Sequence, residues 1–129
     1  MNRFAGTVLA LGGGLASLLA GGYLAEHKID RGEYYALITF SSAGAMLLSS
    51  ANDMLMLFLG LETMSLGVYA MTGFRRGNAR SAEAALKYFL LGSFAAALLL
   101  MGAALLYVVT GHTDFPGIAQ SLRAGAPEG

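Results

Sequence analysis

The sequence has 129 residues, which is room for one domain. It is 56% hydrophobic and 12% charged, and a chain this short buries only about two-thirds of the surface that its unfolded form exposes. This composition excludes a water-soluble globular domain and indicates a bilayer as the solvent. Eight basic and eight acidic residues balance to zero net charge, which argues against a nucleic-acid partner. The absence of Cys excludes disulfides and thiolate metal sites.

Four apolar segments in chain order approach the length of about 20 residues that a spanning helix needs. They cover residues 4–25, 34–51, 54–74 and 82–109, and a polar tail follows at 110–129. Membrane β-strands would instead be short segments of alternating polarity. The sequence therefore predicts an all-α, integral membrane protein with about four transmembrane helices in a single membrane domain.

The first segment carries small residues at every fourth position, namely Gly13, Ser17 and Gly21. Small residues at this spacing lie on one helix face and let two helix backbones approach closely inside a bilayer. We therefore expect this face to be a helix-packing face.

The same segment also fits a cleaved signal peptide, because Arg3 precedes an apolar run and small residues follow at 20–22. Its removal would place the basic turn at 75–80 outside the cell. That placement opposes the positive-inside rule, so we expect the segment to remain as a helix.

Basic residues in the connectors predict the orientation. One side of a four-helix arrangement carries only Arg3 and Arg123, whereas the other side carries five basic residues: Lys28, Arg31, Arg75, Arg76 and Arg80. Cytoplasmic loops are enriched in Lys and Arg. Both termini are therefore predicted outside the cytoplasm.

Glu62 is the charged residue nearest the centre of a predicted span, nine residues after Asp53 and thirteen before Arg75. At about 1.5 Å per residue it is more than about 10 Å from either end. A carboxyl group there is normally protonated, paired or next to water, which makes it a candidate proton-binding group. Ser65 and Tyr69 share its helix face. The alternative is a structural Glu that is hydrogen-bonded to a neighbouring helix.

Lys87 is the second ionisable residue inside a predicted span, and Glu83 precedes it by four residues. Its long side chain can reach the membrane surface, or it can form a functional ion pair, and the composition favours neither. His27 and His112 are isolated, with no second metal ligand at a suitable spacing. We expect no cofactor or metal site on the chain and no catalysis in the ordinary sense, only charge movement.

Three segments resemble a known family: RGEYYAL at 31–37, SSANDMLMLFLGLETMSLGVY at 49–69 and RSAEAALKYFLLG at 80–92. They are similar to subunit N of the proton-pumping NADH–quinone oxidoreductase, bacterial respiratory complex I. The resemblance implies part of an antiporter-like helix bundle, of which these four helices match the third to sixth spans. It also implies that Glu62 belongs to the polar axis that carries protons and that Lys87 is a membrane lysine needed for activity.

The resemblance further implies a bacterial inner-membrane location and other membrane-arm subunits as partners. NADH, flavin, iron–sulfur clusters and quinone would bind to other subunits. The sequence departs from the family at Gly67, where the family usually has Pro, so a kink near Glu62 is expected to be softer. The chain also lacks the later spans of the family, and we expect it to be a fragment or a split subunit.

Two other functions fit the same residues. A small proton-coupled exporter also has four short helices and one buried Glu, but such exporters carry that Glu in the first helix and use Trp to receive aromatic cations. This sequence has no Trp. A non-catalytic assembly subunit would instead use the Gly13, Ser17 and Gly21 face for docking.

Overall fold

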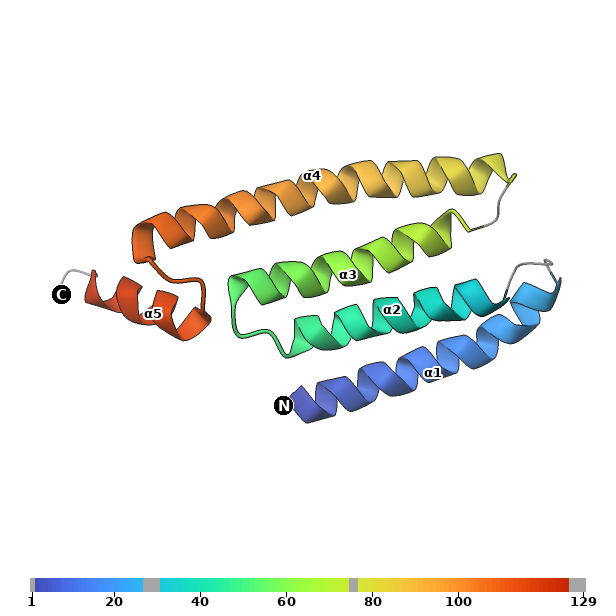
Figure 1. The fold of residues 1–129 in the computed structure, drawn as a ribbon, viewed down its shortest axis with the longest axis horizontal. Coiled ribbons are helices and arrows are strands. Elements are labelled where there is room, and N and C mark those ends of the chain that lie inside the picture. Colours follow the sequence, from blue (N-terminus) through green and yellow to red (C-terminus); the bar gives the residue numbers. More distant parts are fainter. Residues whose placement is uncertain (1, 27–30, 75–76, 126–129) are drawn as a thin grey trace.

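The computed structural model describes residues 2–26, 31–74 and 77–125, which form five helices (Figure 1). These are α1 (Asn2–Glu26), α2 (Arg31–Ser49), α3 (Met54–Thr72), α4 (Ala79–Thr110) and α5 (Phe115–Ala124). The predicted all-α fold is confirmed, and within the described ranges the only strand-like pairing is one isolated bridge between Asp53 and Asp114.

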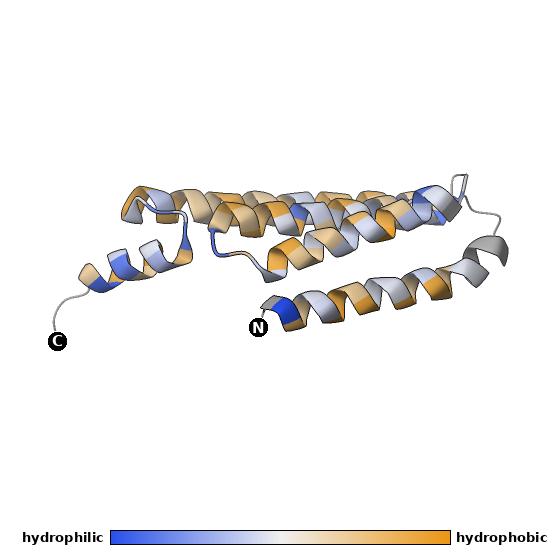
Figure 2. Cartoon of the chain, turned by 60° about the horizontal axis from the view of Figure 1, so that its bottom comes forward, coloured by the Kyte–Doolittle hydropathy of each residue, from blue (hydrophilic) through white to orange (hydrophobic). Residues whose placement is uncertain are grey.

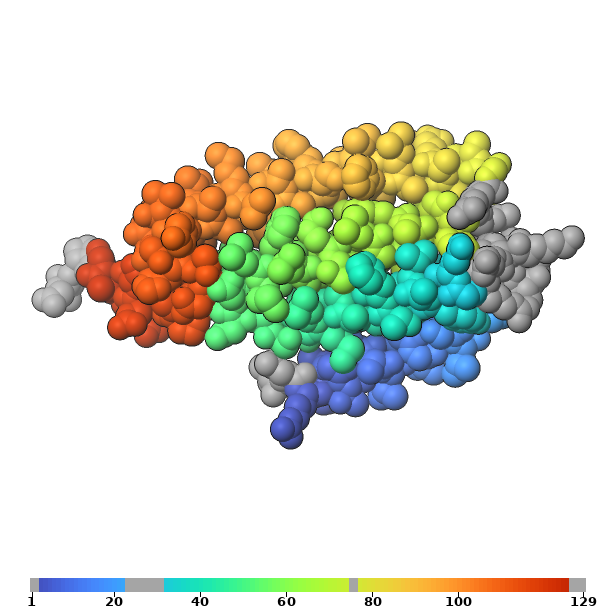
Figure 3. Space-filling view, viewed as in Figure 1, coloured from blue at the N-terminus to red at the C-terminus, as the bar shows by residue number. Residues whose placement is uncertain are grey.

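Helices α1 to α4 lie side by side in chain order and alternate in direction (Figure 1). The N-terminus, the turn between α2 and α3, and α5 share one end of the bundle. The space-filling view shows α3 between α2 and α4, with α1 at the far side of α2 (Figure 3). The most extensive packing joins α2 to α3.

In the described part of the chain, three helices are long and apolar enough to cross a bilayer: Arg3–Gly22 within α1, Met54–Thr72 and Ala79–Thr110. Polar colours gather at the ends of these helices and on α5, and apolar colours cover their lengths (Figure 2). The 19 residues of α2 include Arg31 and Glu33 in the first turn, which makes this helix less apolar. It nevertheless lies between α1 and α3 as part of the same bundle (Figure 1).

Caps explain where the helices begin and end. Asp53 caps α3 and accepts a hydrogen bond from the Leu55 N–H at 2.7 Å. Asn78 caps α4 by accepting from the Ser81 N–H at 3.2 Å, so α4 begins three residues before the predicted start at 82. Gly111 ends α4 with φ 72°, a left-handed conformation that glycine adopts without steric cost.

Helix α5 lies inside the segment that the sequence suggested was only a polar tail. The Asp114 carboxylate caps it by accepting from the Gly117 N–H at 2.8 Å, and Pro116 occupies the first turn. Ile118 is buried, and α5 lies beside the last turns of α4 (Figure 1). An Asp cap followed by Pro is a start signal for a helix, and Phe115, Ile118 and Leu122 follow it at helical spacing, so the sequence carries a signal for α5.

Candidate functional site

Glu62 lies near the middle of α3, eight residues after Met54 and ten before Thr72. At about 1.5 Å per residue, these offsets correspond to about 12 Å and about 15 Å along the helix. The residue is half-buried within the chain. The structure therefore places a carboxyl group about halfway along a helix that is long and apolar enough to span a membrane.

The face of α3 that carries Glu62 is turned away from α2. Gly60 and Gly67 both contact α2, where an added Cβ would lie 2.6 Å from the main-chain N of Leu48 and 2.9 Å from the Cβ of Ser41. Glu62 follows Gly60 by two residues, which is about 200° around the helix. Ser65, half-buried, lies on the same side as Glu62.

Tyr69 lies on the same face of α3, and its ring packs against α4. The ring centroid lies 4.8 Å from that of Tyr88 and 5.7 Å from that of Phe89, both in edge-on geometry. Gly92 makes room for it, since a Cβ there would overlap the Tyr69 hydroxyl and lie 2.8 Å from its Cζ. Tyr69, expected to support Glu62, is therefore a packing residue between α3 and α4, about 10 Å along the helix from Glu62.

Lys87 forms an ion pair with Glu83, at 2.6 Å between Nζ and Oε1, on the outer face of α4. The two side chains are 70% and 63% exposed within this chain. Lys87 lies near the last turn of α3, because a Cβ at Gly73 would lie 2.9 Å from the Cβ of Ala85. Because α4 runs antiparallel to α3, Lys87 is level with about residue 71, nine residues after Glu62, which is about 13 Å along the axis. The structure does not bring Glu62 and Lys87 together.

The small-residue face of α1 is used inside the chain. A Cβ at Gly13 would lie 2.6 Å from Ser42 Oγ, and one at Gly21 would lie 3.2 Å from the Tyr35 hydroxyl, so both glycines face α2. Ser17 Oγ donates to the Gly13 carbonyl at 2.9 Å within α1 itself. The large side chains on the rest of α1 are exposed, among them Leu11, Leu15, Leu18 and Leu19.

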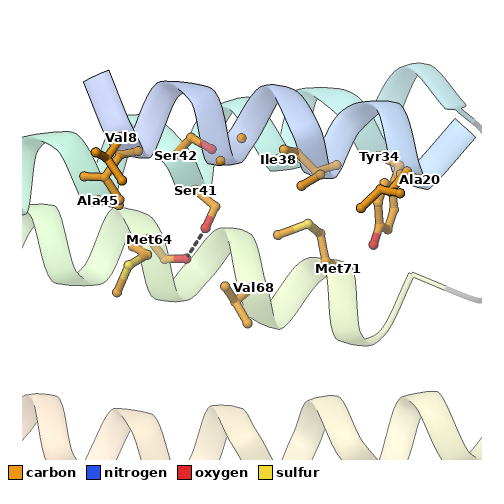
Figure 4. Close-up of a pocket in the computed structure, with 15 residues that line it drawn as sticks. Val8, Ala20, Tyr34, Ile38, Ser41, Ser42, Ala45, Met64, Val68 and Met71 are labelled. Carbon is orange, nitrogen blue, oxygen red and sulfur yellow. Dashed lines mark hydrogen bonds between the residues drawn. The ribbon is translucent and has the colours of Figure 1, made fainter. Parts of the chain in front are cut away.

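An apolar groove of about 920 Å³ runs between α1, α2 and α3 (Figure 4). Ser41 and Ser42 are among its few polar lining residues, and they point toward different neighbours. Ser41 Oγ donates to the Met64 carbonyl of α3 at 3.1 Å, whereas Ser42 faces Gly13 of α1 (Figure 4). The sequence alone does not predict the Ser41–Met64 hydrogen bond, although Gly60 and Gly67, seven residues apart on the side opposite Glu62, are a signal for close packing there.

A polar cluster lies at the end of the bundle that carries the N-terminus. Thr113 Oγ1 donates to Asp53 Oδ2 at 2.7 Å. This hydrogen bond, and to a smaller extent the one from the Leu55 N–H, lowers the pKa of Asp53. His112 Nδ1 lies 3.7 Å from Asp114 Oδ1. Among the residues described, no three acidic or His side chains are grouped so that they could hold a metal ion.

Some predicted positions lie outside the described residues, namely His27, Lys28, Arg75 and Arg76. Arg80 is exposed in the first turn of α4, and Arg123 is exposed in the last turn of α5.

The fold and the site together define a class: a membrane-embedded helix bundle with a carboxyl group at mid-depth in one spanning helix. Residues 51–128 match the family model described as NADH:quinone oxidoreductase/Mrp antiporter, TM. The matched residues include Glu62 and Lys87. The chain belongs to this family, and the resemblance derived from the sequence is confirmed.

Curated relatives agree with this assignment. The chain is 68% identical over 129 residues to NADH-quinone oxidoreductase subunit N 1 of Sorangium cellulosum, covering 98% of this chain and 25% of that protein. It is 48% identical over 116 residues to subunit N of Methylobacterium nodulans, covering 89% and 24%. It is 46% identical over 109 residues to subunit N of Desulfovibrio desulfuricans, covering 84% and 22%. The chain thus spans about a quarter of the length of these relatives.

Proposed function

We propose that the chain is part of the membrane arm of an NADH–quinone oxidoreductase and contributes to proton translocation coupled to NADH oxidation and quinone reduction. The observation that carries this proposal is Glu62, a carboxyl group at mid-depth in a spanning helix, inside the part of the chain that matches the antiporter family. The identity of 68% to a subunit N supports it.

In this proposal Glu62 binds and releases the translocated proton. Burying a charge at this depth costs several kcal/mol, so a modest change in the surroundings changes the proton affinity of the carboxyl group. Conformational change elsewhere in the complex would supply that change. Lys87, whose charge lies near one end of α3, would act on the proton path at a distance of about 13 Å along the axis rather than by contact.

The proposal assigns no redox step to this chain. NADH, flavin, iron–sulfur clusters and quinone would bind to other subunits, and the partners of this chain would be the other membrane-arm subunits. The enzyme class is therefore that of a translocase subunit, which acts on protons and binds no cofactor itself.

We also propose a bacterial inner-membrane location with both termini outside the cytoplasm. The helices alternate in direction, so the N-terminus and α5 lie at the end opposite Arg80 (Figure 1). The excess of basic residues in the connectors at the Arg80 end supports a cytoplasmic location for that end.

The test uses substitutions of Glu62 in the assembled complex in inverted membrane vesicles. Glu62→Ala should reduce NADH-driven proton uptake at least tenfold, and Glu62→Asp, which keeps an ionisable group, should spare more of it. Glu83→Gln is the matched control, since this Glu lies in the exposed pair near the start of α4. Normal proton uptake by the alanine variant would exclude Glu62 as the proton carrier.

A further inference from the structure

The main chain of α2 contacts the turn of α3 that carries Glu62, on the side of α3 opposite the Glu62 side chain. A Cβ at Gly44 would overlap the main-chain N of Met64 and lie 2.9 Å from the carbonyl carbon of Thr63. The peptide bond one residue after Glu62 therefore rests directly on α2. Only a residue without a side chain permits this approach.

A hydrogen bond ties the same turn to α2. Ser41 Oγ donates to the Met64 carbonyl at 3.1 Å, between residues 23 positions apart (Figure 4). Ser41 is 8% exposed, and a hydroxyl group buried at this depth is costly without a partner. Gly67 allows the approach, because a Cβ there would lie 2.9 Å from that of Ser41.

These contacts act on the side of α3 opposite Glu62. Gly60 and Gly67 bracket Glu62 in sequence and both rest on α2, while the carboxyl group projects about 200° around the helix from Gly60. Contact with α2 fixes the orientation of this turn. Any rotation or shift of α3 against α2 therefore changes the surroundings of the Glu62 carboxyl group.

We propose that Ser41 is a positioning residue for Glu62: through the Met64 carbonyl and the Gly44 and Gly67 contacts, α2 fixes the rotation of α3 and so the proton affinity of the carboxyl group. The inference rests on the proposed function, in which Glu62 is the proton-binding group. Ser41 touches no proton itself and acts through α3.

The experiment follows the protonation of Glu62 with dicyclohexylcarbodiimide, which modifies protonated carboxyl groups in apolar surroundings. Native membranes that contain the chain are labelled across a pH series, and modification of the Glu62 peptide is measured by mass spectrometry, with Glu62→Gln as the blank. Ser41→Ala and Gly67→Ala should each move the midpoint pH by at least half a unit, about a threefold change in proton affinity.

Two matched controls separate positioning from general loss of packing. Ser42→Ala changes the neighbouring serine, which faces α1, and Gly102→Ala adds a methyl group to α4 where no heavy atom of another helix lies within 4 Å. Both should keep the wild-type midpoint. Circular dichroism on the purified variants checks that the helix content is unchanged.

The proposal is overturned if Ser41→Ala labels with the wild-type midpoint, or if Ser42→Ala moves it as far as Ser41→Ala does. The proposed function fails by a different result, namely normal proton uptake by Glu62→Ala. Labelling does not depend on proton uptake, so the two failures are distinguishable.

Discussion

The Thr113 hydroxyl donates a 2.7 Å hydrogen bond to Asp53 Oδ2, although 60 residues separate the two in sequence. Main-chain bonds run beside it, from the Met54 N–H to the Thr113 carbonyl at 2.8 Å and from the Phe115 N–H to the Asn52 carbonyl at 3.0 Å. The start of α3 is thereby joined to the connector between α4 and α5. This connection closes the end of the bundle that carries the N-terminus.

Thr113→Val should loosen this closure, because valine keeps the shape of threonine and removes the donor to Asp53. We expect a lower thermal midpoint in detergent, together with faster hydrogen exchange in α5. Thr7→Val is the control, since Thr7 Oγ1 bonds only within its own helix, to the Arg3 carbonyl at 2.7 Å. Equal midpoints for the two variants would contradict a role for Thr113 in closing the bundle.

The same contact predicts a pH dependence of stability. Because the Thr113 hydroxyl and the Leu55 N–H lower the pKa of Asp53 below 3.8, the folded state favours the ionised carboxylate. This contribution is fully present above the unfolded pKa and is lost as the pH falls through the folded value. The midpoint difference between the wild type and Asp53→Asn should therefore be constant near neutral pH and shrink below about pH 4. A difference that stays constant down to pH 2 would rule this out.

Gly92→Ala should destabilise the α3–α4 contact, because the new methyl group would overlap the Tyr69 hydroxyl. Overpacking costs about 1–3 kcal/mol, whereas Ala gains at most about 1 kcal/mol over Gly in a helix, so the net effect is a loss. Adding Tyr69→Phe, which removes the overlapping oxygen, should recover part of it. The measurement is the unfolding midpoint in mixed detergent micelles.

Gly102→Ala is the matched control for Gly92→Ala. It lies on the same helix with open space around it, so only the helix propensity changes, and the variant should be neutral or up to about 1 kcal/mol more stable. If both alanine variants lose stability equally, the Tyr69 contact is not what makes Gly92 necessary.

The sequence predicts the features of this fold that depend on local composition. Apolar length predicts the long helices, and a single carboxyl group in a long apolar run identifies Glu62 without reference to any neighbour. It is harder to predict from the sequence which face of a helix packs against which neighbouring helix. Tyr69 lies on the same helix face as Glu62, yet its packing between helices becomes visible only from α4, where Tyr88, Phe89 and Gly92 contact its ring.

Long-range polar contacts were not predictable for the same reason. Nothing near Thr113 in the sequence indicates that its partner is Asp53. The start and the apolar spacing of α5 can be read from the sequence, but its place at the end of the bundle depends on residues far away in the chain. At Gly67, where the family usually has Pro, α3 continues as one helix from Met54 to Thr72. Here glycine serves close packing against Ser41, a role that depends on the neighbouring helix.

Substitution of Lys87 can separate an effect on proton uptake from an effect on stability. Its pair with Glu83 is solvent-accessible in this chain, at 70% and 63% exposure, and exposed pairs four residues apart on a helix contribute only about 0.3–0.5 kcal/mol. Lys87→Met should therefore change the unfolding midpoint little.

If the charge of Lys87 acts on the proton path, the same variant should still lower NADH-driven proton uptake severalfold in assembled vesicles, and Lys87→Arg should retain most of it. Glu83→Gln breaks the pair but keeps the Lys87 charge, so it should behave like the wild type. A fall in stability that matches the fall in uptake would instead assign Lys87 a structural role.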